Sequence, residues 1–235
     1  MGAIFRREVL SYFTSPIGYI FLAVFYAASA VIFSTNSLNT GTTSLDNFFA
    51  QLMIILIVLI PILTMRTMSE EKRNKTDQCL LTSPVSLMGI VAGKFLAAFL
   101  IYLMGVAITV VYAIVVSAFS SPDWNVIVGN ILGLILLGAA FIAVGIFCSS
   151  FTENQVVAAV TSFITMVVLY LFTTIGNLIP VDFISKIFSK LSFWERYYKF
   201  TYGLFDLSNV LFFISVVVVF LFLTVRVWEK RRWSW

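Results

Sequence analysis

Few residues of this chain have side chains that could carry out chemistry. Histidine is absent, which removes the usual base of hydrolytic triads, the usual haem ligand and the commonest zinc ligand. The two cysteines, Cys79 and Cys148, are too few and too far apart in the sequence to indicate a disulfide framework. We therefore expect no catalytic residue, no metal site and no cofactor on this chain.

Nucleotide binding and intramembrane acid–base chemistry also lack their residues. The chain has no Gly-rich loop followed by Lys that would cradle phosphates, and no Gly-x-Ser-x-Gly turn. Its apolar stretches contain neutral polar residues such as Gln51, Asn130 and Asn177, but no paired carboxylates. A proton-driven pump would need ionisable groups at that depth. Energy for transport must therefore come from another subunit, or transport is passive.

One charged internal segment, residues 66–94, begins with a run that has the features of a helix. Thr67 and Glu70 have the spacing of a capping box, which marks a helix start. Glu71 and Lys75 are placed for an ion pair one helical turn apart, and Pro84 ends the run. We interpret this run as a surface on which another protein pushes; a solvated connection between two membrane spans is the alternative.

The elements that must position these residues are membrane helices. The hydrophobic residues make up 60% of the chain, the charged residues 11%, and the mean hydropathy is +1.02. A soluble domain would carry roughly a quarter charged residues, and a spanning helix needs about 20 apolar residues. We expect an all-α membrane protein with one domain over residues 1–235 and six spans, at about 17–33, 48–65, 95–119, 126–148, 156–179 and 207–225.

The basic residues orient these spans. Most of the 15 Lys and Arg residues fall in residues 1–15, 66–94 and 226–235, which share one side of the membrane if there are six spans. Cytoplasmic segments carry the excess of Lys and Arg, so both chain ends are predicted to lie in the cytoplasm. No basic run is long enough to indicate nucleic acid as a partner.

Pro61, near the end of the second span, predicts a kink or an early exit there.

The N-terminal residues 1–15 allow more than one interpretation. Apolar side chains alternate there with Arg6, Arg7 and Glu8, which suits a short helix in the membrane interface; a basic flank that anchors the first span is the alternative. A cleaved signal peptide is a third, because a small-residue triplet, Ala-Ser-Ala, follows the first apolar run. Pro16 separates the basic pair from that run, so we expect an uncleaved first span.

The segment before the last span is amphipathic and then aromatic. Residues 182–191 place apolar side chains on one helical face, with Lys186 and Lys190 opposite, and residues 193–200 are dense in aromatic rings. Such residues favour the membrane–water boundary. We expect a helical or re-entrant element at the outer end of a pathway, or a plain interfacial belt.

Three stretches resemble the ABC-2 type permeases of ABC transporters. Residues 70–76 (Glu-Glu-Lys-Arg-Asn-Lys-Thr) and 80–86 (Leu-Leu-Thr-Ser-Pro-Val-Ser) are similar to the signature that follows the second span of these permeases. The N-terminal run with Arg7, Glu8 and Tyr12, and the C-terminal run at residues 200–233, are similar to the small permeases related to the gliding-motility ABC transporter. Residues 77–79 (Asp-Gln-Cys) depart from the more apolar or acidic family pattern.

The resemblance implies a six-span permease of a bacterial plasma membrane that pairs with a second copy or a paralogue. Separate cytoplasmic ATPase subunits, which use ATP and Mg²⁺, would drive it, and relatives often work with an auxiliary protein that bears a large extracytoplasmic domain. The implied residues of the ATPase-coupling helix are Glu70, Glu71, Lys72, Arg73, Lys75, Thr76, Leu80, Leu81, Ser83 and Pro84, and those of the interfacial helix are Arg6, Arg7, Glu8 and Tyr12. Residues 182–203 would form an extracellular re-entrant element.

We therefore predict the permease subunit of an ATP-driven exporter. The alternative is a membrane scaffold or assembly subunit that transports nothing itself, which predicts no substrate-stimulated ATP hydrolysis when it is reconstituted with its partner. An intramembrane enzyme is disfavoured, because no reactive pair of side chains is present. The aliphatic and Phe-rich spans suit lipid, peptide or other amphipathic cargo, but core packing explains the same residues.

Overall fold

The chain folds into helices throughout the part that the structure describes. This computed structural model describes residues 2–38, 45–76, 85–119, 123–178, 191–201 and 206–232. No strand occurs in these residues, and six of their helices are long and apolar enough to cross a membrane. The prediction of an all-α membrane protein with six spans is confirmed.

The helices follow the predicted order of spans and connections. The six spanning helices are α2 (Pro16–Phe33), α3 (Asp46–Thr64), α6 (Leu87–Phe119), α7 (Trp124–Ser149), α8 (Gln155–Leu178) and α11 (Leu207–Arg232). The shorter helices are α1 (Gly2–Thr14), α4 (Arg66–Arg73) and α10 (Phe193–Thr201). A π-helical turn, η1 (Ser34–Leu38), extends α2 at its C-terminal end. The helix predicted for the N-terminus and the one predicted after the second span thus correspond to α1 and α4.

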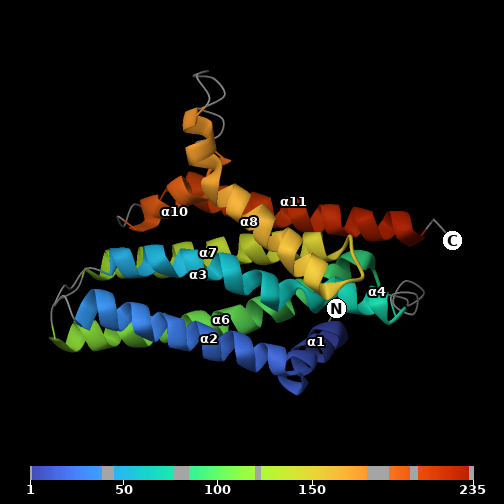
Figure 1. Cartoon of the computed structure of the whole chain (residues 1–235), viewed down its shortest axis with the longest axis horizontal. Helices are drawn as coiled ribbons and strands as arrows, with labels where there is room; N and C mark the ends of the chain where they lie inside the picture. The colour runs from blue at the N-terminus through green and yellow to red at the C-terminus, as the bar shows by residue number, and fades with distance from the viewer. Residues whose placement is uncertain are drawn as a thin grey trace.

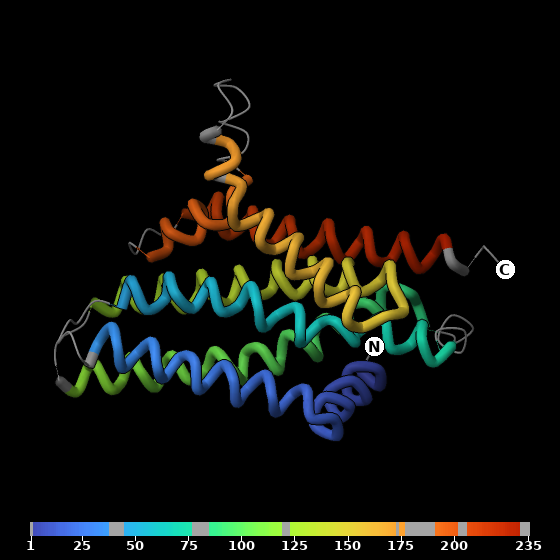
Figure 2. The backbone as a smooth tube through the Cα atoms, viewed as in Figure 1, coloured from blue at the N-terminus to red at the C-terminus, as the bar shows by residue number. Residues whose placement is uncertain are grey.

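Four of the spanning helices form a bundle with two helices at its centre. Figure 1 shows α2, α3, α6 and α7 running along the long axis, with both chain ends toward one end of the molecule; we call this the terminal end. In α3 and α7, 61% and 67% of the apolar window is buried inside the protein, against 17% in α8 and α11. Helix α11 packs along α7, while α8 crosses the bundle obliquely (Figure 2). The core is therefore built around α3 and α7.

Small residues let the central helices approach one another closely. Tyr102 of α6 lies against Gly138 of α7 and donates its hydroxyl hydrogen to the Leu134 carbonyl at 2.6 Å. Thr64 of α3 lies against Gly145 of α7 in the same way. A Cβ atom added at either glycine would overlap these side chains. Such contacts stabilise packing between membrane helices, where burial from water supplies little driving force.

The third span begins earlier than the sequence analysis predicted. Helix α6 starts at Leu87, whereas the span was expected from residue 95. The predicted boundary rested on Lys94, a charge that interrupts the apolar run. In the fold this charge is paired with carboxylates from two other helices, so the helix continues through it.

The second span does not exit early at Pro61. This residue is buried inside α3, and the helix continues to Thr64. The helical path then runs through Met65 into α4, so that one candidate span extends over Asp46–Arg73.

Candidate functional site

Helix α4 continues α3 and is not a separately capped helix. Met65 has helical dihedral angles (φ −55°, ψ −37°), and its N–H donates to the Pro61 carbonyl at 2.9 Å. Thr67 lies inside the helix, so the predicted capping box is wrong. Glu70 instead pairs with Arg66 one turn earlier, with 2.7 Å between Nε and Oε2.

The ion pair predicted between Glu71 and Lys75 does not form. Helix α4 ends at Arg73, and Lys75 lies in the turn that follows, with a φ of 55°. The one-turn spacing would have required the helix to continue. The Glu71 side chain points into the bundle instead, where its Oε1 atom accepts hydrogen bonds from Arg7 at 2.6 Å and Lys94 at 2.9 Å.

Lys94 of α6 is the central cation of this site. Its side chain is 1% exposed, and Nζ lies 2.9 Å from Oε1 of Glu71 and 3.2 Å from Oε1 of Glu8. It also donates to the Thr67 carbonyl at 2.8 Å, so all three of its N–H donors have acceptors. A buried ammonium group is stable only with such partners. Lys94 therefore ties α6 to α1 and α4.

Helix α1 contributes the opposite side of the same cluster. Nη2 of Arg7 lies 2.7 Å from Oε1 of Glu8 and 2.6 Å from Oε1 of Glu71. Burial opposes the charge of Arg7, but the carboxylates of Glu8 and Glu71 raise its pKa above the ordinary value. The two carboxylates are mostly buried, whereas the Arg7 side chain is half exposed at the rim. We call Arg7, Glu8, Glu71 and Lys94 the ion cluster.

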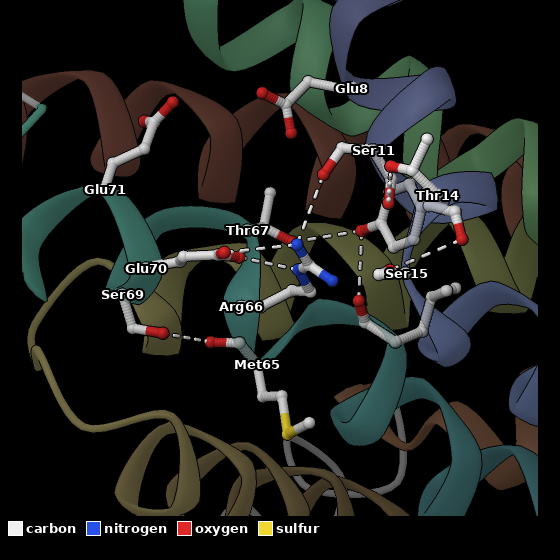
Figure 3. Close-up of polar contacts among 12 residues, drawn as sticks. Glu8, Ser11, Thr14, Ser15, Met65, Arg66, Thr67, Ser69, Glu70 and Glu71 are labelled. Carbon is white, nitrogen blue, oxygen red and sulfur yellow. Dashed lines mark hydrogen bonds and ion pairs between the residues drawn. The ribbon is translucent and has the colours of Figure 1, made fainter. Parts of the chain in front are cut away.

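Two neutral side chains of α1 add further contacts to α3 and α4. Figure 3 shows Arg66 reaching from α4 toward Ser11, with 3.2 Å between Nη2 and Oγ, while it also pairs with Glu70. The Tyr12 hydroxyl donates to the Leu63 carbonyl at 3.0 Å. Burial raises the pKa of Tyr12 to about 12, so this hydroxyl stays a neutral donor at physiological pH. Helix α1 is thus held along its length.

The buried side of α4 is also attached to α7. Lys72 is buried, and its Nζ atom donates a hydrogen bond to the carbonyl of Ser150, the residue that follows α7. Helix α4 is therefore joined by side-chain hydrogen bonds to α1, to α6 and to the end of α7. The exposed end of α4, by contrast, carries Arg73, with Lys75 and Thr76 in the following turn.

A cavity of about 230 Å³ lies between α1 and α4 beside the ion cluster. Three cations (Arg7, Arg66 and Lys94) and three carboxylates (Glu8, Glu70 and Glu71) line it, so the formal charges of its walls balance. Oε2 of Glu71 is buried and has no hydrogen-bond partner in the described part of the chain. Among these residues, no group of three or more His, Cys, Asp or Glu side chains could hold a metal ion.

The structure brings together only some of the residues predicted for this site. It joins Arg7, Glu8, Tyr12, Glu70, Glu71 and Thr76 around the cavity, whereas Arg6, Arg73 and Lys75 are exposed elsewhere and Lys72 contacts α7. The predicted residues Leu80, Leu81, Ser83 and Pro84 lie outside the described residues.

The sequence analysis missed Ser11, Arg66, Thr67, Asn74 and Lys94 as members of this site. A single cation inside an otherwise apolar run was the available signal for Lys94, because such a charge must find a partner within the fold.

At the other end of the bundle, α10 is buried against the central helices. The Phe193 ring stacks on Phe141 of α7, with 5.6 Å between centroids, and the Tyr197 hydroxyl donates to the Phe49 carbonyl of α3 at 3.0 Å. Phe200 is also buried. These contacts favour an element that enters the bundle over an aromatic belt on its surface. The amphipathic segment predicted before it lies, up to residue 190, outside the described residues.

The family of the chain is shown by a match over most of its length. A family model described as ABC-2 family transporter protein matches residues 22–227. The match begins within α2, ends within α11 and includes α4 and α10. The comparison with curated proteins gives no match. The chain belongs to the ABC-2 family of transporter proteins and is a transmembrane permease of an ABC transporter.

Proposed function

We propose that this permease serves an ATP-driven exporter, works as a pair with a second copy or a paralogue, and is driven by separate cytoplasmic ATPase subunits. The observation that carries the proposal is the position of α4. Its buried face is bonded to α1, α6 and α7, while its end is exposed and charged. A helix with these attachments can pass a push on its exposed end to several spans at once.

The distribution of charged residues supports the orientation of the permease in the membrane. Exposed basic residues gather at the terminal end, among them Arg6, Arg73, Lys75 and Lys230. Cytoplasmic surfaces of membrane proteins carry this excess, so the terminal end faces the cytoplasm of a bacterial plasma membrane. An ATPase bound there meets the exposed end of α4, and ATP with Mg²⁺ is bound by the ATPase and not by this chain.

In this proposal the ion cluster prevents α1, α4 and α6 from moving relative to one another. Separating Glu71 from Lys94 would leave charges in a buried site, which costs several kcal/mol. Helices α1, α4 and α6 should therefore move as one body when α4 is pushed. In this proposal α10, which packs against α7, α8 and α3 at the other end, is a re-entrant element of the pathway. An auxiliary protein with a large extracytoplasmic domain, as in relatives of the gliding-motility transporter, belongs to the same proposal.

Docking is tested by reversing the exposed charges near the end of α4. Arg73→Glu and Lys75→Glu should reduce co-purification of the ATPase from membranes without unfolding the permease, because both side chains are exposed. Lys199→Glu, an exposed residue of α10 at the other end, is the matched control. Co-purification at the wild-type level with both variants would remove α4 as the docking element.

Transmission is tested separately from docking. Glu71→Gln weakens the ion cluster from inside, so it should leave ATPase binding intact but reduce the effect of the permease on ATP hydrolysis. If the wild-type permease binds the ATPase without changing its hydrolysis rate in proteoliposomes, the chain is a scaffold subunit and the exporter proposal is wrong.

A further inference from the structure

An apolar groove lies between α1 and α6, apart from the ion cluster. Its volume is about 460 Å³, and it is lined by Gly2, Phe5, Leu96, Phe99, Leu100 and Leu103. The four residues of α6 recur at positions i, i+3, i+4 and i+7, which form one face of a helix. That face therefore continues past the edge of α1 and forms the floor of the groove.

The groove lies at membrane depth. Its floor belongs to the candidate span Leu87–Ala118, on the half that leads to the terminal end. Its lining has no polar side chain in the described residues. A peptide segment placed there would find no partners for its backbone N–H and C=O groups, which is unfavourable in the hydrocarbon region. The lining therefore suits a chain without polar groups.

The size of the groove also argues against a helix of a second copy. An α-helix with its side chains is about 10 Å across, so 460 Å³ corresponds to roughly one helical turn. A hydrocarbon chain, which is much thinner, fits such a space along its length.

Arg6 of α1 supplies a positive charge beside this groove. Arg6 is exposed and lies four residues after Gly2 and next to Phe5, both of which line the groove. Residues four apart, such as Gly2 and Arg6, lie on the same helix face. A helix with basic and apolar faces at the membrane surface attracts anionic lipids.

We propose that this groove is a binding site for one acyl chain of an anionic phospholipid, with Arg6 contacting its headgroup. The occupant comes from the leaflet at the terminal end and fixes α1 against α6. The site is independent of ATPase docking, because none of its lining residues belongs to the ion cluster or to α4.

The test uses the full-length permease alone, reconstituted into vesicles of equal parts phosphatidylglycerol and phosphatidylcholine. After extraction into mild detergent, native mass spectrometry counts the lipids that remain bound. We expect the wild type to retain phosphatidylglycerol about fivefold over phosphatidylcholine, the ratio that corresponds to one basic residue near a membrane surface. Arg6→Gln should bring this ratio close to one.

Filling the groove should remove the bound lipid itself. Leu100→Trp should lower the retained lipid by about one molecule, and so should Leu96→Trp, which changes a more exposed residue and serves if the first variant misfolds. Leu223→Trp on α11 is the control, because Leu223 and Leu96 are 38% and 39% exposed. Lys230→Gln is the control for the charge.

Three results would overturn the proposal. The first is equal retention of both lipids by the wild type, and the second is retention by the two tryptophan variants of as much lipid as by Leu223→Trp. The third is cross-linking of Leu100→Cys to a second copy in membranes, in a background of Cys79→Ser and Cys148→Ser, because a protein would then cover the groove. None of these results bears on the proposed coupling through α4.

Discussion

Replacing Lys94 by Met should destabilise the permease strongly, although Met is apolar and Lys94 lies within a membrane helix. The substitution removes the ammonium group that lies 2.9 Å from Glu71 and 3.2 Å from Glu8, and both carboxylates are mostly buried. It also leaves the Thr67 carbonyl without its side-chain donor. A hydropathy argument alone would predict the opposite sign.

The expected loss of unfolding free energy depends on the charged groups that remain after the Lys94→Met substitution. Removing one partner of a buried ion pair costs about 3–5 kcal/mol. Arg7 still contacts both carboxylates, so we expect the lower end, about 3 kcal/mol, or roughly a hundredfold in the unfolding equilibrium. Adding Glu71→Gln removes one of the uncompensated charges, so the double variant should be less destabilised than the sum of the two single variants by about 1–2 kcal/mol.

The assay is reversible unfolding of the purified permease in mixed micelles with increasing dodecyl sulfate, followed by circular dichroism. Lys230→Met, at the exposed end of α11, is the control and should unfold like the wild type. If Lys94→Met unfolds like this control, or if the two cluster substitutions are additive, then the ion cluster does not hold α1, α4 and α6 together.

Three further predictions concern other parts of the bundle. Gly138→Ala should destabilise it by about 1–3 kcal/mol, because its Cβ atom would overlap the tyrosine packed against it; Gly2→Ala, which has open space, should not. Tyr197→Phe should cost about 1 kcal/mol through the lost hydrogen bond to the Phe49 carbonyl, measured by the same unfolding assay. The pKa of Tyr12 is raised to about 12, so its proton is held more tightly in the folded state, and stability should fall as the pH rises from about 10 to about 12; Tyr12→Phe should show a shallower fall.

The spans could be predicted from the sequence because each is a long apolar run, and hydrocarbon thickness sets the length of such a run. The boundaries failed where a charge is neutralised by another part of the chain. In the sequence, Lys94 indicates the end of a loop. In the fold, Glu8 and Glu71 pair with its charge, so the helix can include it.

The sequence analysis singled out the two segments that meet at the candidate site, but not the contacts between them. The charged run after the second span and the basic N-terminus were both singled out, but the sequence does not show that they meet. Glu71 was assigned to Lys75 because local spacing is all that a sequence displays. Its observed partners, Arg7 and Lys94, are brought to it by the packing of α1 and α6.

The most direct measurement is photocross-linking from the turn after α4. A photoreactive amino acid at Lys75, which is exposed, would be activated in native membranes that contain all subunits of the transporter, and the captured partner would be identified by mass spectrometry. If the end of α4 receives the force of ATP binding, the captured partner is the ATPase, and the capture depends on nucleotide. Capture of an extracytoplasmic protein, or of lipid alone, would contradict the coupling role of this helix.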